Sequence, residues 1–337
     1  MATTIVVGGF YGDEGKGKIV GYLAEHDKMQ HVVRAGGGPQ AGHTVTRGLK
    51  VTQIPSGFVN TTSKLYIARG TVINPATVIS EIVKYDCKNR IRIDYGCTVI
   101  ESDHIEREKD LVERIGSVGT GTGPARMDRL NRSAKLAKDI PALAPYLGDV
   151  ADEINNAVTK KQRILIEGVQ GFGLSLLDHE YYPNVTSQDT TASQFCADVG
   201  LGPKAIDEIV CVFKSYMSRV GKGELETAWT EEEQQKYGIK EFGSVSGRPR
   251  RLGHFDDAMA RKAIQRNTAT QGALTCLDRL FPGNTGADMS SKLTPDAQEF
   301  LQQRDFAING NWHYRGIQLI STGPDLEQMI DNRSYIP

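Results

Sequence analysis

The stretch Thr4–Lys18, TIVVGGFYGDEGKGK, begins as a short apolar run and continues into a glycine-rich loop. Such a strand-to-helix turn directs backbone N–H groups at an anion, and the helix N-terminus adds its positive dipole. The spacing is neither a Walker A motif, which needs Gly at position 10 and Ser or Thr at position 17, nor G-x-G-x-x-G. A glycine-rich turn is as often only a tight connection. The charges of this one (Asp13, Glu14, Lys16 and Lys18) favour a phosphate loop in which a carboxylate binds Mg²⁺ or acts as a base.

Further apolar runs alternate with stretches of helical spacing. We expect strands at Thr4–Val7, His31–Arg34, Lys64–Ala68, Arg163–Glu167, Ile209–Lys214, Ala273–Leu277 and Gly316–Ile320. Helical spacing recurs at residues 17–26, 134–143 and 259–264, and the charged run Thr230–Lys240 predicts a solvated helix without chemistry. Short apolar strands between helices are typical of a parallel sheet covered on both faces. The sequence therefore predicts an α/β fold, a single domain of residues 1–337 with a mainly parallel central sheet, flanking helices and long active-site loops.

Composition excludes several classes of protein. The 337 residues carry 40 Lys and Arg against 41 Asp and Glu, whereas nucleic-acid and polybasic membrane binders need an excess of positive charge. The longest apolar runs are too short to cross a bilayer, and the N-terminus does not resemble a signal peptide. Five scattered cysteines without a C-x-x-C pair argue against a disulfide scaffold and a zinc cage. We expect a cytoplasmic protein that binds neither nucleic acid nor membrane.

Four later loops repeat the anion-binding theme. Arg34–Thr44 places His43 after three glycines, and although a lone histidine is usually structural, this one is a candidate acid beside the first loop. Gly116–Gly123 is rich in glycine and hydroxyls, and Glu167–Gly171 offers an amide that could read a base edge. Ser246–Arg251 carries three arginines, which form either a solvated turn or a site for carboxylates and phosphates. These loops together indicate phosphoryl transfer between charged substrates.

Several of these segments resemble the signatures of adenylosuccinate synthetases, in order along nearly the whole chain. They are Gly12–Lys18, Ala41–Thr44, Glu167–Gly171, Ser246–Arg248 and Ser321–Asp325. The length, Gly171–Ser175 and Ala197–Gly200 resemble the short archaeal form. The resemblance implies a homodimeric α/β enzyme that joins L-aspartate to C6 of a purine nucleoside monophosphate, driven by a nucleoside triphosphate and Mg²⁺.

The resemblance also implies roles in the reaction. Asp13 would deprotonate the purine N1, so that O6 attacks the γ-phosphate of the donor. His43 would donate a hydrogen bond or a proton to the transferring phosphoryl group, and Lys16 would hold donor phosphates. Mg²⁺ would bind Asp13 and the Gly42 carbonyl. In the 6-phosphoryl intermediate the leaving group at C6 is phosphate instead of the poorer oxide, and the aspartate amine can displace it.

Three sets of binding residues follow from the same resemblance. The acceptor nucleotide would contact Asp13, Glu14, Gln40, Val118, Arg132, Gln170, Thr186 and Arg248, with Arg132 reaching in from the neighbouring subunit. The donor nucleotide would contact Gly12, Gly15, Lys16, Gly17, Lys18, Gly42, Thr44, Arg250, Asp278, Ser321 and Gly323. The aspartate carboxylates would contact Ser244, Val245, Ser246, Arg248 and Arg250.

Departures from the family pattern concern the choice of nucleotides. Gln40 replaces an Asn and Val118 replaces a Thr, and both positions line the acceptor site. Cys276 stands where bacterial members carry a Lys that recognises guanine, so the donor could be ATP or dATP as well as GTP. These changes favour the bacteriophage relatives, which use dGMP to make N6-succino-2-amino-2'-deoxyadenylate and would act in the host cytoplasm. Asp13, which we expect some phage relatives to replace, favours the alternative, IMP with GTP.

Two readings outside the ligase class stay open. A degenerate homologue would bind nucleotides without turnover, although Asp13, Lys16, His43 and Gln170 are all present. A GTPase-like switch would hydrolyse its triphosphate without any acceptor. Phosphate release that depends strictly on L-aspartate and a purine monophosphate separates the ligase from both.

Overall fold

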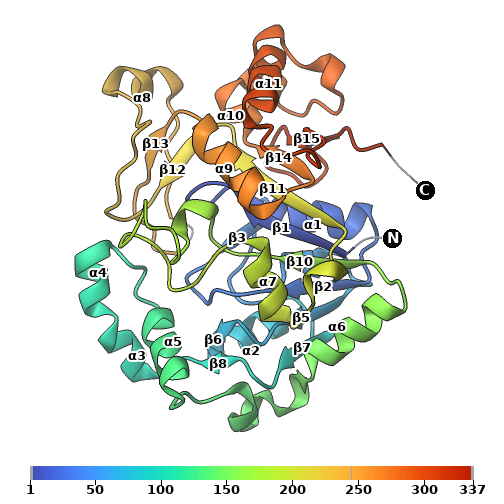
Figure 1. The fold of residues 1–337 in the computed structure, drawn as a ribbon, viewed down its shortest axis with the longest axis vertical. Helices are drawn as coiled ribbons and strands as arrows, with labels where there is room; N and C mark the ends of the chain where they lie inside the picture. The colour runs from blue at the N-terminus through green and yellow to red at the C-terminus, as the bar shows by residue number, and fades with distance from the viewer. Residues whose placement is uncertain (1–2, 244, 335–337) are drawn as a thin grey trace.

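A ten-stranded sheet lies at the centre of the computed structural model, which describes residues 3–243 and 245–334 (Figure 1). Neighbouring strands are parallel except for the antiparallel pair at one edge, β15 and β16. In spatial order the strands are β16 (Met329–Asp331), β15 (Ile317–Ser321), β14 (Gln271–Thr275), β11 (Glu208–Lys214), β1 (Thr3–Gly8), β10 (Ile164–Glu167), β2 (His31–Arg34), β5 (Lys64–Ile67), β7 (Ile91–Asp94) and β9 (Leu147–Gly148). The predicted α/β class with a mainly parallel sheet is confirmed.

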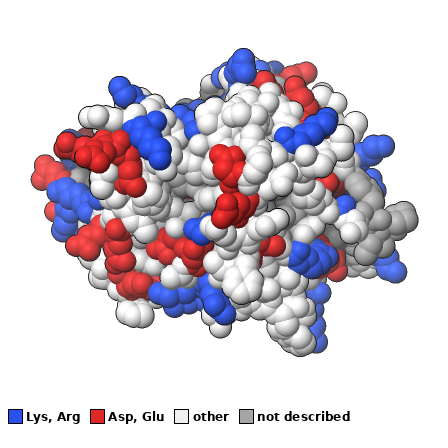
Figure 2. Space-filling model, turned by 90° about the horizontal axis from the view of Figure 1, so that it is seen from above, with Lys and Arg blue, Asp and Glu red and all other residues white. Residues whose placement is uncertain are grey.

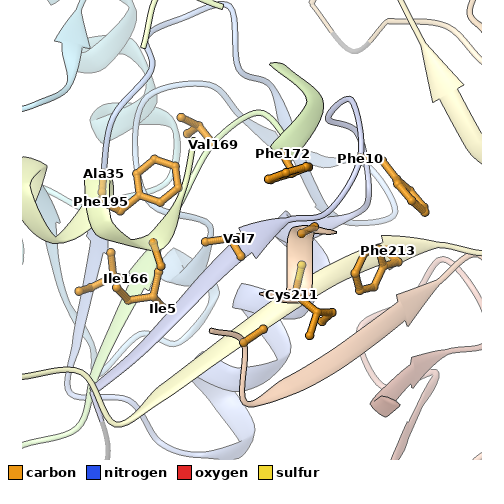
Figure 3. Packing of buried hydrophobic residues seen from close by; sticks show 14 of the residues in the cluster. Ile5, Val7, Phe10, Ala35, Ile166, Val169, Phe172, Phe195, Cys211 and Phe213 are labelled. Atoms are coloured by element: carbon orange, nitrogen blue, oxygen red, sulfur yellow. The ribbon is translucent and has the colours of Figure 1, made fainter. Parts of the chain in front are cut away.

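Both faces of the sheet are buried, because successive side chains of a strand point to opposite faces. In β1, Ile5 and Val7 pack into one core with Phe195 and Phe213 (Figure 3), while Val6 packs into the other. The longer helices that contribute to the first core are α6 (Val150–Thr159), α7 (Ala192–Val199), α9 (Asp257–Asn267) and α11 (Pro295–Ile308). Those of the second core are α1 (Lys16–His26) and α2 (Pro75–Lys84).

Smaller elements complete the described chain. Three helices lie beside one another at the lower left of Figure 1, namely α3 (Ser102–Arg107), α4 (Lys109–Ile115) and α5 (Thr122–Asn131). The short strand pairs are β3 (His43–Thr46) with β4 (Leu49–Val51), β6 (Val72–Ile73) with β8 (Thr98–Val99), and β12 (Met217–Arg219) with β13 (Arg251–Gly253). Two further helices are α8 (Glu231–Tyr237), which buries no residue, and α10 (Leu277–Leu280). The prediction of a solvated helix in Thr230–Lys240 is therefore confirmed.

One predicted helix is wrong. Residues 134–143 form no α-helix; instead Ala137–Asp139 and Pro141–Tyr146 form 3-10 turns. Pro141 and Pro145 have no N–H to donate and their rings clash with a preceding turn, so the apolar spacing cannot continue as an α-helix. The strand predicted at Ala273–Leu277 ends two residues earlier, at Thr275, because α10 begins at Leu277.

The sheet order explains why the chemistry-bearing loops meet. Strands β14, β11, β1, β10 and β2 are consecutive neighbours, so their carboxyl ends share one edge of the sheet. The glycine-rich loops follow β1, β2 and β10 at this edge, where parallel α/β folds bind their ligands. Within the described ranges no helix has both the length and the apolar character to cross a bilayer. On the face seen in Figure 2, basic and acidic side chains lie interspersed, in keeping with a net charge of -1.

Candidate active site

A cavity of about 960 Å³ opens at the carboxyl ends of these strands. It is lined by the loops after β1, β2 and β10, by residues 114–127 and by residues 240–250. The predicted site residues that line it are Gly12, Asp13, Gly15, Lys16, Gly17, Gln40, Gly42, His43, Thr44, Val118, Gln170, Thr186, Val245, Ser246, Arg248 and Arg250. The fold thus brings together residues from all five loops that the sequence singles out.

The remaining predicted residues do not line this cavity. Glu14 and Lys18 are buried beside it, and Arg132 is exposed at the C-terminal end of α5. The three residues predicted for the donor base (Asp278, Ser321 and Gly323) lie near Lys18 rather than on the cavity wall. Ser244 lies outside the described residues.

Glu14 turns beneath the first loop instead of facing a ligand. Its carboxylate accepts the N–H of Phe10 at 3.0 Å and of Gly12 at 2.8 Å, and its other oxygen lies 2.7 Å from Lys16 Nζ. Lys16 also donates to the carbonyl of Gln170. A loop of this shape needs an internal acceptor for its N–H groups, and Glu14 supplies it; the contact of Glu14 with the acceptor nucleotide stays a prediction.

The N-terminus of α1 faces the cavity without a side-chain cap. Gly15 is the N-cap residue, with φ +82°, and no side chain accepts a hydrogen bond from the first turn. Gly15, Lys16 and Gly17 all line the cavity. The first N–H groups of a helix have no partner within it, so an uncapped N-terminus at a cavity is suited to an anion such as phosphate.

Lys18 holds a segment that is distant in the sequence. Its Nζ donates to Ser321 Oγ at 2.8 Å and to the carbonyls of Gly323 at 2.6 Å and Gln328 at 2.9 Å. Burial lowers the pKa of Lys18 to about 8, partly offset by the charge of Asp278. Lys18 therefore fixes the segment predicted to meet the donor base onto the helix predicted to meet the donor phosphates.

His43 is held by a buried charged pair. Its Nδ1 contacts the carboxylate of Glu167 and lies 2.6 Å from an Arg34 nitrogen, and Arg34 lies 2.7 Å from Glu167. Burial and then Arg34 lower the pKa of His43 to about 4. Burial alone would raise the pKa of Glu167, but Arg34 and His43 lower it to about 2. The ring is therefore neutral at pH 7. A proton on Nδ1 would satisfy the Glu167 carboxylate, and His43 lines the cavity.

Asp13 belongs to a second charged network, centred on Glu241. Asp13 Oδ2 lies 2.6 Å from Arg250, whose other nitrogen lies 3.1 Å from Glu241. Glu241 is also 2.7 Å from Lys214 and 2.9 Å from Arg279, and it accepts from the hydroxyl of Tyr216. Burial alone would raise the pKa of Glu241, but Lys214 lowers it to about 2 with help from Tyr216 and Arg250. Arg250 is thus fixed between two carboxylates and presents one face to the cavity.

Two glutamines line the predicted acceptor region, and they differ in whether their side-chain amides are hydrogen-bonded. Both amide atoms of Gln170 are buried and have no hydrogen-bond partner among the described residues. A buried unpaired amide is costly, which marks Gln170 as a group that awaits a ligand. Gln40, by contrast, accepts from the hydroxyl of Thr122 at 2.7 Å and so fixes one end of α5 to the second loop.

The loop at residues 116–123 is ordered by two charged side chains. The buried carboxylate of Glu108 accepts from the Ser117 hydroxyl and the Gly121 N–H. Arg248 donates to the carbonyls of Gly116 at 2.6 Å and Ser117 at 3.2 Å. This contact joins the predicted aspartate loop to the third anion loop and leaves the rest of the guanidinium fork toward the cavity.

The cavity offers oxygen ligands suited to Mg²⁺. Of the carboxylates that line it, Glu108 and Glu241 are occupied by several donors, whereas Asp13 is paired with Arg250 alone among the described residues and is about 30% exposed. Mg²⁺ usually takes one or two protein carboxylates and completes its octahedron with phosphate oxygens and water. Asp13 fits such a site, and Gly42, the second predicted ligand, lines the same cavity.

Sequence reasoning did not assign a role to Glu241, Arg34 or Glu108, although each fixes part of the site. Glu241 directly follows a charged run with an exposed helix, and nothing local distinguishes it from that run. Arg34 and Glu167 each end an apolar strand, β2 and β10 respectively, and begin a loop that the sequence singles out, but that interpretation gave roles to His43 and Gln170 instead. That position is worth inspection in any parallel sheet.

The chain is similar to known proteins over nearly its whole length. The sequence model of the family described as adenylosuccinate synthetase matches residues 5–142 and 134–285. The chain is 47% identical over 339 residues to the adenylosuccinate synthetase of Archaeoglobus fulgidus, covering 99% of each chain. It is 45% identical over 343 residues to that of Methanococcus vannielii, covering 99% of this chain and 100% of the relative.

Two solved structures share the fold. Fully ligated adenylosuccinate synthetase from Plasmodium falciparum has a TM-score of 0.88 at 20% identity, covering 99% of this chain and 100% of that one. The succinoaminodeoxyadenylate synthetase of cyanophage S-2L, bound to dGMP and to dATP as an energy donor, has a TM-score of 0.80 at 23% identity, covering 99% and 96%. At these identities the likeness concerns the fold and does not extend to substrates.

Proposed function

The chain belongs to the adenylosuccinate synthetase family and is a C–N ligase of that type, and from this premise we propose that it joins L-aspartate to C6 of IMP with GTP as the phosphoryl donor. The observation that carries the proposal is identity of 43–47% over essentially the full length to archaeal relatives named adenylosuccinate synthetase. We further propose that residues 1–337 act as one catalytic unit and that the enzyme is a homodimer.

The preference for dGMP, expected from Gln40 and Val118, has no support in the comparisons. The dGMP-binding cyanophage protein is 23% identical, far below the archaeal relatives. The amide oxygen of Gln40 is engaged by Thr122, and Val118 is one wall residue among many. We therefore assign Gln40 to the packing of the second loop against α5, and nothing in the structure explains Val118; IMP replaces dGMP as the proposed acceptor.

Asp13 acts as the base in this proposal. Arg250 holds its carboxylate at 2.6 Å, and Glu241 holds Arg250 from behind. The carboxylate accepts the N1 proton of the purine, and O6 then attacks the γ-phosphate. When bound by Asp13 and Gly42, Mg²⁺ neutralises phosphate charge. Gln170, with its unpartnered amide, reads the edge of the base.

His43 acts as the acid. In the free protein its ring is neutral, and the proton on Nδ1 faces Glu167. The negative charge of bound donor phosphates raises the pKa of the ring, so that it takes a proton from solvent as the substrates bind, and Nε2–H then donates to the transferring phosphoryl group. Glu167 keeps the ring oriented throughout, because it also accepts from the Ser56 N–H at 2.6 Å and cannot rotate away without breaking that bond.

The substrate phosphates and carboxylates are held by separate groups. The uncapped N-terminus of α1 binds donor phosphates, and Lys16 orients the carbonyl of Gln170 and the loop above Glu14. Val245, Ser246, Arg248 and Arg250 surround the aspartate. Displacement of the 6-phosphate by the aspartate amine completes the reaction.

An acceptor competition tests the proposal. Purified protein receives Mg²⁺, L-aspartate and GTP with either IMP or dGMP, and the succino-product is quantified by chromatography. We expect product with IMP and at least about 100-fold less with dGMP, a difference of about 2.7 kcal/mol. Turnover confined to dGMP would overturn the choice of acceptor. Phosphate release without aspartate or acceptor would indicate a nucleotide switch instead of a ligase.

A further inference from the structure

Five arginines line the active-site cavity, and they differ in whether a carboxylate pairs with them. Ion pairs with described carboxylates are made by Arg114, Arg250 and Arg279. Arg126 and Arg248 make none with the residues that the structure describes. Arg248 is proposed to bind aspartate, whereas Arg126 has no role in the reaction as proposed above.

The guanidinium of Arg126, in α5, is only partly satisfied by the protein. Its Nη2 donates to the carbonyl of Gly70 at 3.2 Å and to the side-chain oxygen of Gln188. Neither Nε nor Nη1 has a hydrogen-bond partner among the described residues. Nε is fully buried, but Nη1 is not and keeps accessible surface. A cation at the cavity wall therefore has an accessible nitrogen that is free for a ligand.

No described carboxylate lies close enough to neutralise Arg126. Asp198 acts on it electrostatically from beyond ion-pair distance, and Asp198 itself accepts from Gln194 at 2.8 Å. Burial lowers the pKa of Arg126 more than Asp198 raises it. A guanidinium nevertheless stays charged at neutral pH. An unpaired charge that is partly withdrawn from water is stabilised by an anionic ligand.

Helix α5 places Arg126 beside the loop after β2. Thr122, one turn earlier on the same face of the helix, donates to Gln40 at 2.7 Å. Gln188, which accepts from Arg126, also accepts from the N–H of Gly37 at 3.2 Å. Gln40 and Gly37 both belong to this loop, so Arg126 is tied to it at two points.

This loop lies on the side of the cavity predicted to hold the acceptor nucleotide. A Cβ at Gly37 would be 3.3 Å from Nε2 of Gln170, the amide proposed to read the base edge. The proposed function assigns the donor phosphates to the N-terminus of α1 and the aspartate to the loop that carries Arg248. The 5'-phosphate of the acceptor still lacks a cation of its own in this chain, because Arg132 is expected from the neighbouring subunit.

We propose that Arg126 binds the 5'-phosphate of the acceptor nucleotide from within the same chain. Guanidinium groups suit phosphate oxygens, and the phosphate gives Nη1 an acceptor and the buried charge a counter-ion. The inference deepens the proposed function and rests on it. The enzyme should therefore bind the nucleotide more tightly than the nucleoside, and Arg126 should account for much of the difference.

Calorimetry with IMP and with inosine tests the contact, since the two ligands differ only in the phosphate. We expect Arg126→Met to weaken IMP at least about tenfold, the size of a charged hydrogen bond, and to leave inosine unchanged. This comparison forms a double-mutant cycle in which one change is made on the ligand. An unchanged affinity for IMP, or an equal loss for both ligands, overturns the inference.

Two further variants separate the contact from general effects of charge and folding. Arg126→Lys keeps the charge without the planar fork, and it should weaken IMP at least about threefold and leave inosine unchanged. Arg129→Met removes an exposed charge of the same helix that does not line the cavity, and it should leave both affinities unchanged. An equal loss of IMP affinity in Arg129→Met and Arg126→Met overturns the specific role of Arg126.

The inference and the proposed function can fail separately. If the wild type binds dGMP and not IMP, the proposed acceptor is wrong, and dGMP against deoxyguanosine tests Arg126 in the same way because the phosphate is shared. If Arg126→Met has the KM of the wild type for IMP and turns it over normally, the inference is wrong and the proposed function stands. We expect instead a raised KM for IMP with a smaller change in kcat.

Discussion

At the residue scale, the proposed mechanism depends most on Asp13, which acts as the base. It adopts φ +62°, a left-handed conformation uncommon outside glycine, and this turn points its carboxylate at Arg250 and the cavity. Glu14, its immediate neighbour, points the other way and serves the loop itself. The two adjacent carboxylates thus have different roles: Asp13 faces the cavity, whereas Glu14 stabilises the loop. The backbone conformation determines these directions.

Asp13→Asn should abolish most turnover. The amide keeps the volume and still contacts Arg250, but it cannot accept the N1 proton, so we expect kcat to fall by about 10²–10⁴-fold. Product formation with IMP, GTP and aspartate measures this effect. Asp288→Asn, at an exposed carboxylate paired with Lys292, is the matched control and should retain full activity. Unchanged turnover in Asp13→Asn would remove the residue from the mechanism.

Glu241→Gln should destabilise the fold in a pH-dependent manner. The folded pKa of Glu241, about 2, is below the ordinary value of 4.5, so its charge stabilises the fold above pH 4.5, and this contribution is lost as pH falls from 4.5 toward 2. Removal of one partner from a buried charged network costs about 3 kcal/mol.

Urea unfolding of this variant should therefore show the deficit at pH 7 and a smaller one at pH 3. Glu232→Gln, on the exposed face of α8, is the control and should unfold like the wild type at both values. A deficit of equal size at pH 7 and pH 3 would show that Glu241 acts by its shape and not by its charge.

At the element scale, the packing of α1 against β3 determines where His43 lies. A Cβ at Gly17 would be 2.7 Å from the Thr44 carbonyl oxygen and 2.9 Å from His43 Cβ. Only a glycine in the first turn of α1 lets β3 approach this closely. The contact between α1 and β3 at Gly17 therefore fixes the N-terminus of α1 and the candidate acid His43 relative to each other.

Gly17→Ala should lower activity and stability together. The added methyl would push β3 away, and a misplacement of about 1 Å can cost about 100-fold in kcat, with a loss of about 1–3 kcal/mol in unfolding free energy. Steady-state rates and urea unfolding check both effects. Gly202→Ala is the control, because a Cβ there meets nothing within 4 Å and the backbone has φ -74°. Wild-type kcat in Gly17→Ala would refute this account of the contact.

At the scale of the whole molecule, contacts within one chain do not account for the exposed apolar side chains of α5 or for the position of Arg132 after it. Met127 and Leu130 are 60% and 75% exposed, and the exposed Arg132 follows them. Met127 and Leu130 also line the active-site cavity. An apolar surface at the mouth of a site is suited to a second subunit, which is the arrangement that the proposed role of Arg132 requires.

Subunit mixing tests this arrangement. Asp13→Asn and Arg132→Ala proteins should each be weak, but a mixture that exchanges subunits should regain about a quarter of wild-type activity, since half the dimers are hybrids with one intact site. A mixture of Asp13→Asn with His43→Asn is the control and should regain nothing, because both residues act within one chain. Failure of the first mixture to exceed its components would place Arg132 outside the neighbouring site.

The sequence alone determined the class of the fold and the chemistry of its loops. Both are local properties: apolar runs between helices require a covered parallel sheet, and glycines after a strand direct N–H groups at an anion whatever the rest of the chain does. Short motifs such as Gly12–Lys18 therefore identified the family and most of the cavity wall. The boundaries of strands and the turns at 137–146 were less certain, because prolines and adjoining elements end a pattern that spacing alone would continue.

Only the tertiary structure decided which charged groups face a ligand and which support the site. Lys18 bonds to a residue 303 positions away, and His43 to one 124 positions away. Glu241 is buried by elements that its own sequence surroundings do not reveal. The energy of a charge or a donor depends on what surrounds it in space, and that is fixed only when distant segments pack together.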